Sequence, residues 1–96
     1  MKNNSEQYKK EVLDIIYKIA KDKNLLESFM QDILTPKEYD NVGVRWQIVK
    51  KLAKGEKHEY IASDLKLGVA TVTRGSREMR NKDGGFQKVL KFLKLK

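Results

Sequence analysis

Apolar residues recur at spacings of three and four over most of the chain, which is the periodicity of amphipathic helices. The first stripe consists of Tyr8, Val12, Ile15, Ile16 and Ile19. Ser5 is placed to cap the start of this helix, which ends near residues 22–24, and a second helical pattern covers residues 25–34. The one run that is rich in β-branched residues, 69–73, is short. The pattern therefore predicts an all-helical protein.

A third helix is predicted from Pro36 to the glycine at position 55. Thr35 is a favourable N-cap, Pro36 suits the first helical position, and Glu38 completes a capping box. Gly55 is a typical stop signal. Its apolar stripes are Tyr39, Val42, Trp46, Val49 and Ala53 on one side, and Val44, Ile48 and Leu52 on the other. We expect such a helix to be central and buried on both faces. Gly43 inside it is unfavourable by about 1 kcal/mol relative to alanine, which suggests that another backbone or a ligand approaches closely.

The apolar spacing over residues 60–76 predicts a helix-turn-helix that covers about residues 57–80. The packing positions are Ile61, Ala62 and Leu65 on the first helix, Leu67 in the turn, and Ala70 and Val72 on the second helix, which starts near Gly68. We expect Ala62 and Ala70 to be small because the two helices cross closely there. Val69, Thr71 and Thr73 are expected to be exposed, and short side chains at this end allow close approach to base edges. An ordinary helical hairpin is the alternative interpretation.

The basic charge is confined to the second half of the chain. The sequence has 21 Lys and Arg against 13 Asp and Glu, a net charge of +8. Residues 1–48 carry eight of each sign, so all of the excess lies in residues 49–96. This asymmetry indicates a nucleic-acid-binding face, the alternative being a lysine-rich surface that serves solubility. The predicted DNA-binding residues are Lys66, Gly68, Val69, Ala70, Thr71, Thr73, Arg77 and Arg80. Lys82 and Lys57 are further candidates for phosphate contacts.

Length and composition bound the class of protein. With 96 residues, 40% of them apolar, we expect one globular domain over residues 1–96. The absence of cysteine excludes a disulfide scaffold and a thiol nucleophile and fits a reducing compartment. The N-terminal segment has no continuous apolar stretch of signal-peptide type, so we expect a cytoplasmic protein. His58 is the only histidine and has no metal-ligand or nucleophile set around it, so we predict neither an enzyme nor a metal site. No apolar run approaches ~18 residues, and we expect the basic amphipathic tail, residues 86–96, to dock on a partner subunit rather than a membrane.

Three blocks of the sequence resemble the tryptophan repressor family. They are Leu34-Thr35-Pro36, then Gly43-Val44-Arg45 leading into Ile48-Val49 and Gly55-Glu56, and above all Ala70-Thr71-Val72-Thr73-Arg74-Gly75-Ser76. They occur in the family's order, and the resemblance covers roughly residues 25–80. It implies an all-α fold of six helices with a helix-turn-helix, built as an intertwined homodimer that interlocks through its N-terminal helices and the last one. It also implies a transcriptional repressor that reads a palindromic operator in double-stranded DNA.

The resemblance further implies a small-molecule amino-acid effector, L-tryptophan, which acts as corepressor. The residues that match the family's ligand-binding positions are Asp32, Leu34, Thr35, Arg45, Arg74 and Gly75. In the family two arginines sandwich the indole and engage the carboxylate, and Arg45 and Arg74 stand at these positions. A guanidinium suits both tasks. The backbone carbonyls of Asp32 and Leu34, from the partner chain, would receive the ammonium group, and Gly75 would leave room for the ring.

The sequence departs from the family at several positions. Glu78 stands where the family has a serine near the indole nitrogen, and Lys66 occupies a turn position where glycine is common. The segment 57–60 is one residue shorter than in the best-known members. Two alternatives therefore stay open. One is a related regulator that keeps the dimer and the helix-turn-helix without a tryptophan response, and the other is a dimeric interaction or DNA-packaging module without sequence readout.

Overall fold

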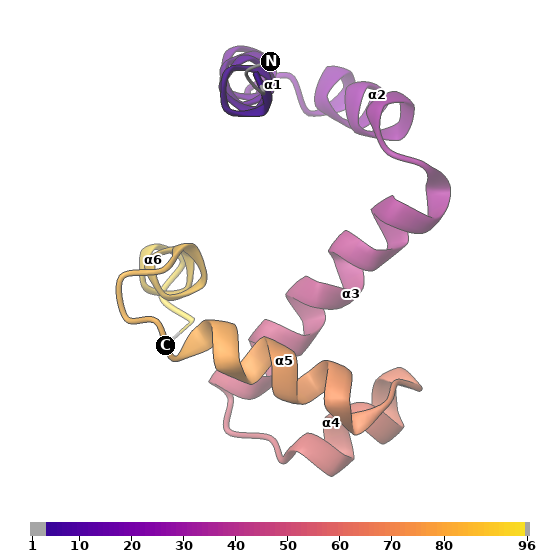
Figure 1. The fold of residues 1–96 in the computed structure, drawn as a ribbon, viewed down its shortest axis with the longest axis vertical. Helices are drawn as coiled ribbons and strands as arrows, with labels where there is room; N and C mark the ends of the chain where they lie inside the picture. The colour runs from indigo at the N-terminus through magenta and orange to yellow at the C-terminus, as the bar shows by residue number, and fades with distance from the viewer. Residues whose placement is uncertain (1–3, 96) are drawn as a thin grey trace. The chain divides into compact units, whose positions relative to one another are not determined.

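The computed structural model describes residues 4–95 and folds them into six α-helices (Figure 1). They are α1 (Ser5–Ile19), α2 (Lys23–Ile33), α3 (Pro36–Ala53), α4 (His58–Leu65), α5 (Val69–Met79) and α6 (Gly85–Phe92). No strand occurs in this part of the chain, and the prediction of an all-helical protein is confirmed. The chain divides into two compact units, Met1–Tyr39 and Asp40–Lys96. The expectation of one domain over residues 1–96 stays a prediction.

The first unit contains α1 and α2, which contact each other. The Asp22 side chain caps α2, because its Oδ1 accepts a hydrogen bond from the Leu25 N–H at 3.1 Å. With this cap α2 begins at Lys23, two residues before the predicted start, and α1 ends before the predicted boundary. Ser5 is the first residue of α1 rather than its N-cap, a position that Asn4 takes.

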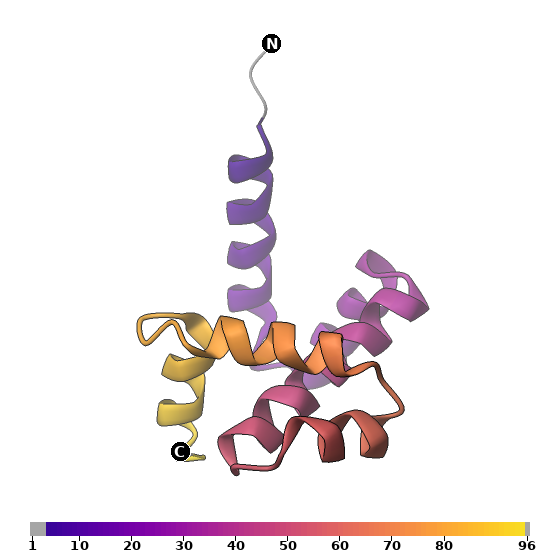
Figure 2. The same cartoon turned by 60° about the horizontal axis from the view of Figure 1, so that its bottom comes forward.

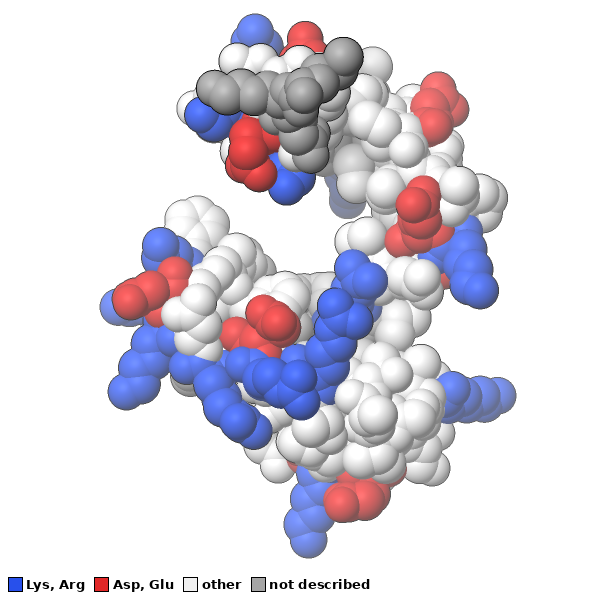
Figure 3. Space-filling view, in the orientation of Figure 1, with Lys and Arg blue, Asp and Glu red and all other residues white. Residues whose placement is uncertain are grey.

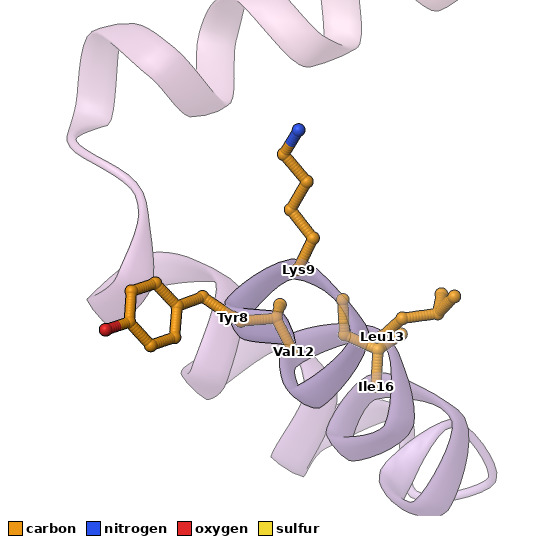
Figure 4. A pocket seen from close by; sticks show the side chains of 5 residues that line it. All are labelled: Tyr8, Lys9, Val12, Leu13 and Ile16. Carbon is orange, nitrogen blue, oxygen red and sulfur yellow. The ribbon is translucent and has the colours of Figure 1, made fainter. Parts of the chain in front are cut away.

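Neither α1 nor α2 buries a side chain fully. One open and largely apolar surface of α1 is lined by Tyr8, Lys9, Val12, Leu13 and Ile16 (Figure 4). On this surface Tyr8 is 62% exposed and Leu13 is 65% exposed. A second hollow in the first unit is lined by Ile16, Lys23, Asn24, Leu26, Glu27, Met30 and Tyr39. Contiguous apolar surface on a folded protein is typical of an interaction site.

The second unit contains the hydrophobic core. Its buried centre consists of Ile48, Ile61, Ala62 and Val72, and Val44, Leu52, Leu65 and Leu67 pack around them. These residues come from α3, α4, the following turn and α5, so three helices meet on one core (Figure 2). The predicted packing positions Ile61, Ala62 and Leu65 on α4, and Val72 on α5, are confirmed.

The long helix α3 is buried only in its second half. Ile48 and Val49, one from each predicted stripe, are buried, whereas Val42 is 43% exposed. The prediction that the helix is buried on both faces therefore holds for its second half and is wrong for its first half. Gly43 is open as well. A Cβ built there would meet no atom of residues 4–95 within 4 Å, so the expected close approach is not made within this chain. The end of α3 is as predicted, because Gly55 adopts φ +85°, a left-handed conformation that stops the helix.

The last helix, α6, contacts α5 and buries Leu90. Gln87 Nε2 donates a hydrogen bond to the Met79 backbone carbonyl at 2.5 Å, which ties the start of α6 to the end of α5. Val89 and Leu93 are about half exposed. Of these three apolar residues, therefore, only Leu90 is fully buried.

Candidate nucleic-acid interface

The helices α4 and α5 are joined by residues 66–68 into a helix-turn-helix (Figure 2). Lys66 ends α4 in the left-handed conformation, with φ 58° and ψ 48°. The Leu67 N–H donates to the Ala62 carbonyl at 2.8 Å, which closes a Schellman-type helix end, and the Leu67 side chain then packs on the core. Gly68 is the N-cap residue of α5. The expected positions of Leu67 at the corner and of Gly68 at the helix start are confirmed.

The inner face of α5 rests on the core of the second unit. Val72 is fully buried, and Gly75 lies so close to α3 that a Cβ on it would stand 2.9 Å from Ile48 Cγ2. A close crossing of α4 and α5 was expected at Ala62 and Ala70. Ala62 is buried in the core, whereas Ala70 is exposed, so the expectation is wrong for Ala70. Gly75, not Ala70, is the residue of α5 whose small size the packing requires.

The outer face of α5 is exposed and basic. The exposed residues of α5 include Val69, Ala70, Thr71, Arg74 and Arg77, and Arg80, which directly follows the helix, is exposed as well. Thr73 is half-buried, which corrects the expectation that it is exposed. None of the three arginines forms an ion pair with a carboxylate of residues 4–95. Figure 3 shows Lys and Arg side chains gathered over α5 and beside α6.

One carboxylate interrupts this basic face. Glu78 is exposed and lies one helical turn after Arg74, yet no ion pair joins the two side chains in the described structure. Residues at i and i+4 project from neighbouring positions on a helix. Glu78 therefore lowers the positive potential around Arg74.

A lysine that the sequence did not single out fixes α4 in place. Lys51 Nζ, at the end of α3, lies 2.8 Å from Asp64 Oδ2 and 3.6 Å from Glu56 Oε1. The hydrogen bond with Asp64 raises the pKa of Lys51, and partial desolvation opposes this rise. The negative charge of Glu56 raises the pKa further. The ion pair ties the first helix of the motif to the last turn of α3. No local pattern indicates it, since Lys51 and Asp64 lie on different helices.

Arg45 and Arg74 lie next to the contact between α3 and α5. Arg45 precedes Ile48 by about one helical turn, and Arg74 adjoins Gly75, the residue that packs against Ile48. Both arginines are exposed, and neither pairs with a carboxylate of residues 4–95. Gly75 itself is occupied by this packing, because Ile48 fills the space that its missing side chain leaves.

The remaining predicted ligand residues belong to the first unit. Thr35 forms the predicted capping box: its N–H donates to Glu38 Oε1 at 2.8 Å, and its Oγ1 accepts from the Glu38 N–H at 3.1 Å. Asp32 and Leu34 lie at the end of α2, and their carbonyl oxygens accept no hydrogen bond from residues 4–95. Free carbonyls at a helix C-terminus carry partial negative charge. They are therefore suited to receive an ammonium group.

Within residues 4–95 no helix is long and apolar enough to cross a membrane. The same part of the chain contains no group of three or more His, Cys, Asp or Glu side chains that could hold a metal ion. His58 is half-buried at the first position of α4.

Two short helices around a tight turn, the second of them basic on its outer face, define a helix-turn-helix protein. The family model described as Trp repressor protein matches residues 7–94. The chain therefore belongs to the Trp repressor family, which is a family of transcriptional regulators, and its six helices have that family's fold. The resemblance carried by the three sequence blocks is confirmed.

Proteins named Trp operon repressor homolog are similar to this chain over most of its length. One from Haemophilus influenzae is 37% identical over 75 residues, which are 77% of this chain and 74% of that protein. One from Vibrio atlanticus is 34% identical over 87 residues, 90% of this chain and 88% of that protein. One from Vibrio parahaemolyticus is 35% identical over 68 residues, with 70% and 66% covered.

Proposed function

We propose that this chain is a sequence-specific DNA-binding repressor that acts as a homodimer on a palindromic operator, with L-tryptophan as its corepressor. The observation that carries the proposal is the outer face of α5, where short side chains and unpaired arginines are exposed together above a packed inner face. Membership of the Trp repressor family and the names of the similar proteins support it.

In this proposal the start of α5 reads the bases. Val69, Ala70 and Thr71 are short and exposed, so the helix end can approach base edges in the major groove. The Thr71 hydroxyl can donate or accept a hydrogen bond, and its methyl group can contact a thymine methyl. Thr73 is half-buried and contributes a smaller contact area.

The cations around the motif bind phosphates. Lys66, Arg77 and Arg80 are exposed and without ion pairs among residues 4–95, and each can approach the DNA backbone. Gly68 is the N-cap residue of α5, and the free N–H groups of a helix start favour a phosphate. These contacts position the protein and make its affinity dependent on salt, while they carry little sequence information.

The homodimer is proposed on the open apolar surface of the first unit. Tyr8, Leu13 and Tyr17 on α1 are each more than half exposed, and Leu25 and Ile33 on α2 are about half exposed. A surface of this kind is typical of obligate subunit interfaces, which are larger and more apolar than transient ones. Sedimentation should show dimers at micromolar concentration, and a folded monomer there would contradict this part of the proposal.

The corepressor site is proposed beside the contact of α3 and α5. Arg45 and Arg74 can both pair with a carboxylate and stack on an indole face. The carbonyls of Asp32 and Leu34 in the partner chain would receive the ammonium group, and Thr35 would lie near the ligand. A molecule held between the two arginines would fix the direction in which α5 leaves the core.

The test is selection of DNA from a pool of random duplexes, with and without tryptophan. We expect a palindromic sequence to be enriched only when tryptophan is present. Arg45→Ala should abolish the effect of tryptophan on operator affinity, whereas the control Arg80→Ala should weaken binding to all duplexes and keep the tryptophan effect. Equal enrichment with and without tryptophan would remove the corepressor from the proposal, and no enrichment in either condition would favour a packaging role.

Glu78 favours a second candidate, a regulator of the same fold that does not respond to tryptophan. Its carboxylate lies one turn from Arg74 on the exposed face of α5 and would add negative charge beside a bound amino acid. Calorimetric titration with tryptophan separates the two candidates. Binding that strengthens in Glu78→Ser would support the corepressor, whereas no binding by either protein would support the second candidate.

A further inference from the structure

Three lysines follow one another at intervals of three residues on and just after α6. Lys88, Lys91 and Lys94, the α6 lysine stripe, are all exposed, and none pairs with a carboxylate of residues 4–95. The helix Gly85–Phe92 itself contains no acidic residue. The helix-turn-helix ends before this stripe, so the function proposed above does not use it.

The stripe begins beside the residue of α6 that contacts the end of α5. Gln87, which donates to the Met79 carbonyl, is that residue, and Lys91 follows Gln87 by one helical turn on the same edge. Val89 and Leu93 lie on the opposite flank of the buried Leu90, at helical angles that leave Lys88 and Lys91 clear of them. A partner subunit could thus cover the apolar flank of α6 without covering the lysines.

The backbone of the last lysine of the stripe has a defined conformation. Lys94 has φ 58°, its N–H donates to the Lys91 carbonyl at 3.1 Å, and the next N–H, of Leu95, donates to the Leu90 carbonyl at 2.9 Å. This left-handed conformation favours glycine, and Lys66 in the helix-turn-helix has the same conformation. A lysine at such a position is compatible with a role for its ammonium group, because glycine would be less strained there.

The stripe is continuous with the basic residues of α5. Residues 74–96 contain eight Lys and Arg and only two acidic residues. Arg77, Arg80 and Lys82 connect the recognition helix to the stripe along the chain, and Figure 3 shows basic side chains running from α5 to the region of α6. One extended polyanion could therefore contact both.

We propose that the α6 lysine stripe binds the phosphates of DNA that flanks the operator, outside the bases that α5 reads. The inference rests on the proposed function, since α5 must first place the protein on DNA. Continuity with α5 favours DNA over a lipid surface, because an amphipathic helix binds a membrane through its apolar side, and we expect the partner subunit to cover the apolar flank of α6. Phe92, which is 84% exposed one turn after Lys88, makes lipid the competing partner to test.

The experiment compares two duplexes that contain the selected operator. One ends at the operator, and the other extends by about 10 base pairs, one helical turn, on each side. The stripe variant is Lys88→Gln/Lys91→Gln/Lys94→Gln. The matched control, Lys10→Gln/Lys18→Gln/Lys21→Gln, removes the same charge from exposed lysines of the first unit, and circular dichroism checks that both variants fold.

The measured quantity is the slope of log affinity against log salt concentration. Each phosphate contact contributes about −0.9, so loss of the stripe should make the slope on the extended duplex shallower by about 2.7 per chain. On the operator-length duplex the stripe variant and the parent should have equal slopes. The control variant should keep the parent's difference between the two duplexes.

Three outcomes overturn the inference. If the parent protein has equal salt slopes on the two duplexes but still prefers the operator over random DNA, there is no flanking contact, and the proposed function is unaffected. Failure to prefer any operator would overturn both. The third outcome is that the stripe variant has the same salt slopes as the parent but no longer binds phosphatidylserine–phosphatidylcholine vesicles. This result would assign the lysines to a lipid surface.

Discussion

Gly43→Ala and Gly75→Ala make the same chemical change inside two helices, and we expect them to move stability in opposite directions. Replacing glycine by alanine inside a helix gains about 1 kcal/mol from helix propensity alone. At Gly43 a Cβ meets nothing within 4 Å, so the whole gain should be observed. At Gly75 the new methyl group would stand 2.9 Å from Ile48 Cγ2, well inside the optimal carbon separation of about 3.5–4.0 Å.

The magnitude at Gly75 depends on how far Ile48 can yield. Ile48 is only 3% exposed, and a β-branched side chain in a helix is largely restricted to one χ1 rotamer. Overpacking of this kind costs about 1–3 kcal/mol, which the helix-propensity gain of about 1 kcal/mol offsets only in part. The net loss for Gly75→Ala is therefore up to about 2 kcal/mol. In a domain of this size each kcal/mol corresponds to about 4–8 °C in Tm.

Thermal and urea unfolding followed by circular dichroism measure both variants at one fixed protein concentration, because the stability of a dimer depends on concentration. Ile48→Ala removes the Cγ2 atom that the new methyl group would meet. In that background Gly75→Ala should be neutral or stabilising, with a coupling energy of about 1 kcal/mol or more. A similar shift in the same direction for both glycine variants, or no coupling with Ile48→Ala, would refute the reasoning.

Three further predictions concern the helix ends and the ion pair. Lys66→Gly should stabilise the chain by about 1 kcal/mol, because the left-handed conformation costs a residue with a side chain roughly that much. The same variant should bind every duplex more weakly, because it removes a cation that contacts phosphate. Urea unfolding measures the first effect and fluorescence anisotropy the second, and an unchanged urea midpoint would contradict the first. Glu38→Ala should cost about 0.5–1 kcal/mol by removing the acceptor of the capping box, whereas the urea midpoint of the control Lys37→Ala should not change. The pKa of Lys51 is raised above its ordinary 10.5, so the stability from its pair with Asp64 is complete below the unfolded pKa and is lost as pH rises through the folded one. The Tm difference between the parent and Lys51→Met should therefore shrink above pH ~10.5, and a difference that does not change with pH would contradict the pairing.

The ends of α3 could be predicted from the sequence because they depend on neighbouring residues. The Thr35–Glu38 capping box forms within four residues, and Gly55 stops the helix through its own backbone conformation. The start of α2 is also local, since Asp22 caps it. The periodic apolar residues there begin only at Leu25, whereas the helix begins at Lys23 because the Asp22 side chain accepts a hydrogen bond from the Leu25 N–H.

The sequence predicts only in part which side of α5 faces the core, because this short helix contains more than one small residue that could lie at a close contact. Ala70 and Gly75 are both small, and only the packing of α5 against α3 decides that Gly75 lies at the crossing. Thr73, next to the buried Val72, is half-buried rather than exposed. Lys51 was missed for a related reason, since its partner Asp64 lies on another helix and no spacing rule relates the two.

The crossing of α3 and α5 links the stability of the fold to the direction of the recognition helix. Gly75 allows α5 to approach Ile48, and the two arginines proposed to hold the ligand, Arg45 and Arg74, lie beside that same contact. In Gly75→Ala either Ile48 or α5 must move to relieve the 2.9 Å contact, and because the buried Ile48 has little rotamer freedom, we expect part of the shift to fall on α5. Base contacts require close geometry, whereas long lysine and arginine side chains can follow a phosphate through a small shift. We therefore expect Gly75→Ala to weaken operator binding by more than it weakens binding to random DNA, and fluorescence anisotropy on the two duplexes measures the ratio. Equal losses on both duplexes would mean that the crossing of α3 and α5 affects stability but not sequence recognition, which would then depend only on the side chains of α5.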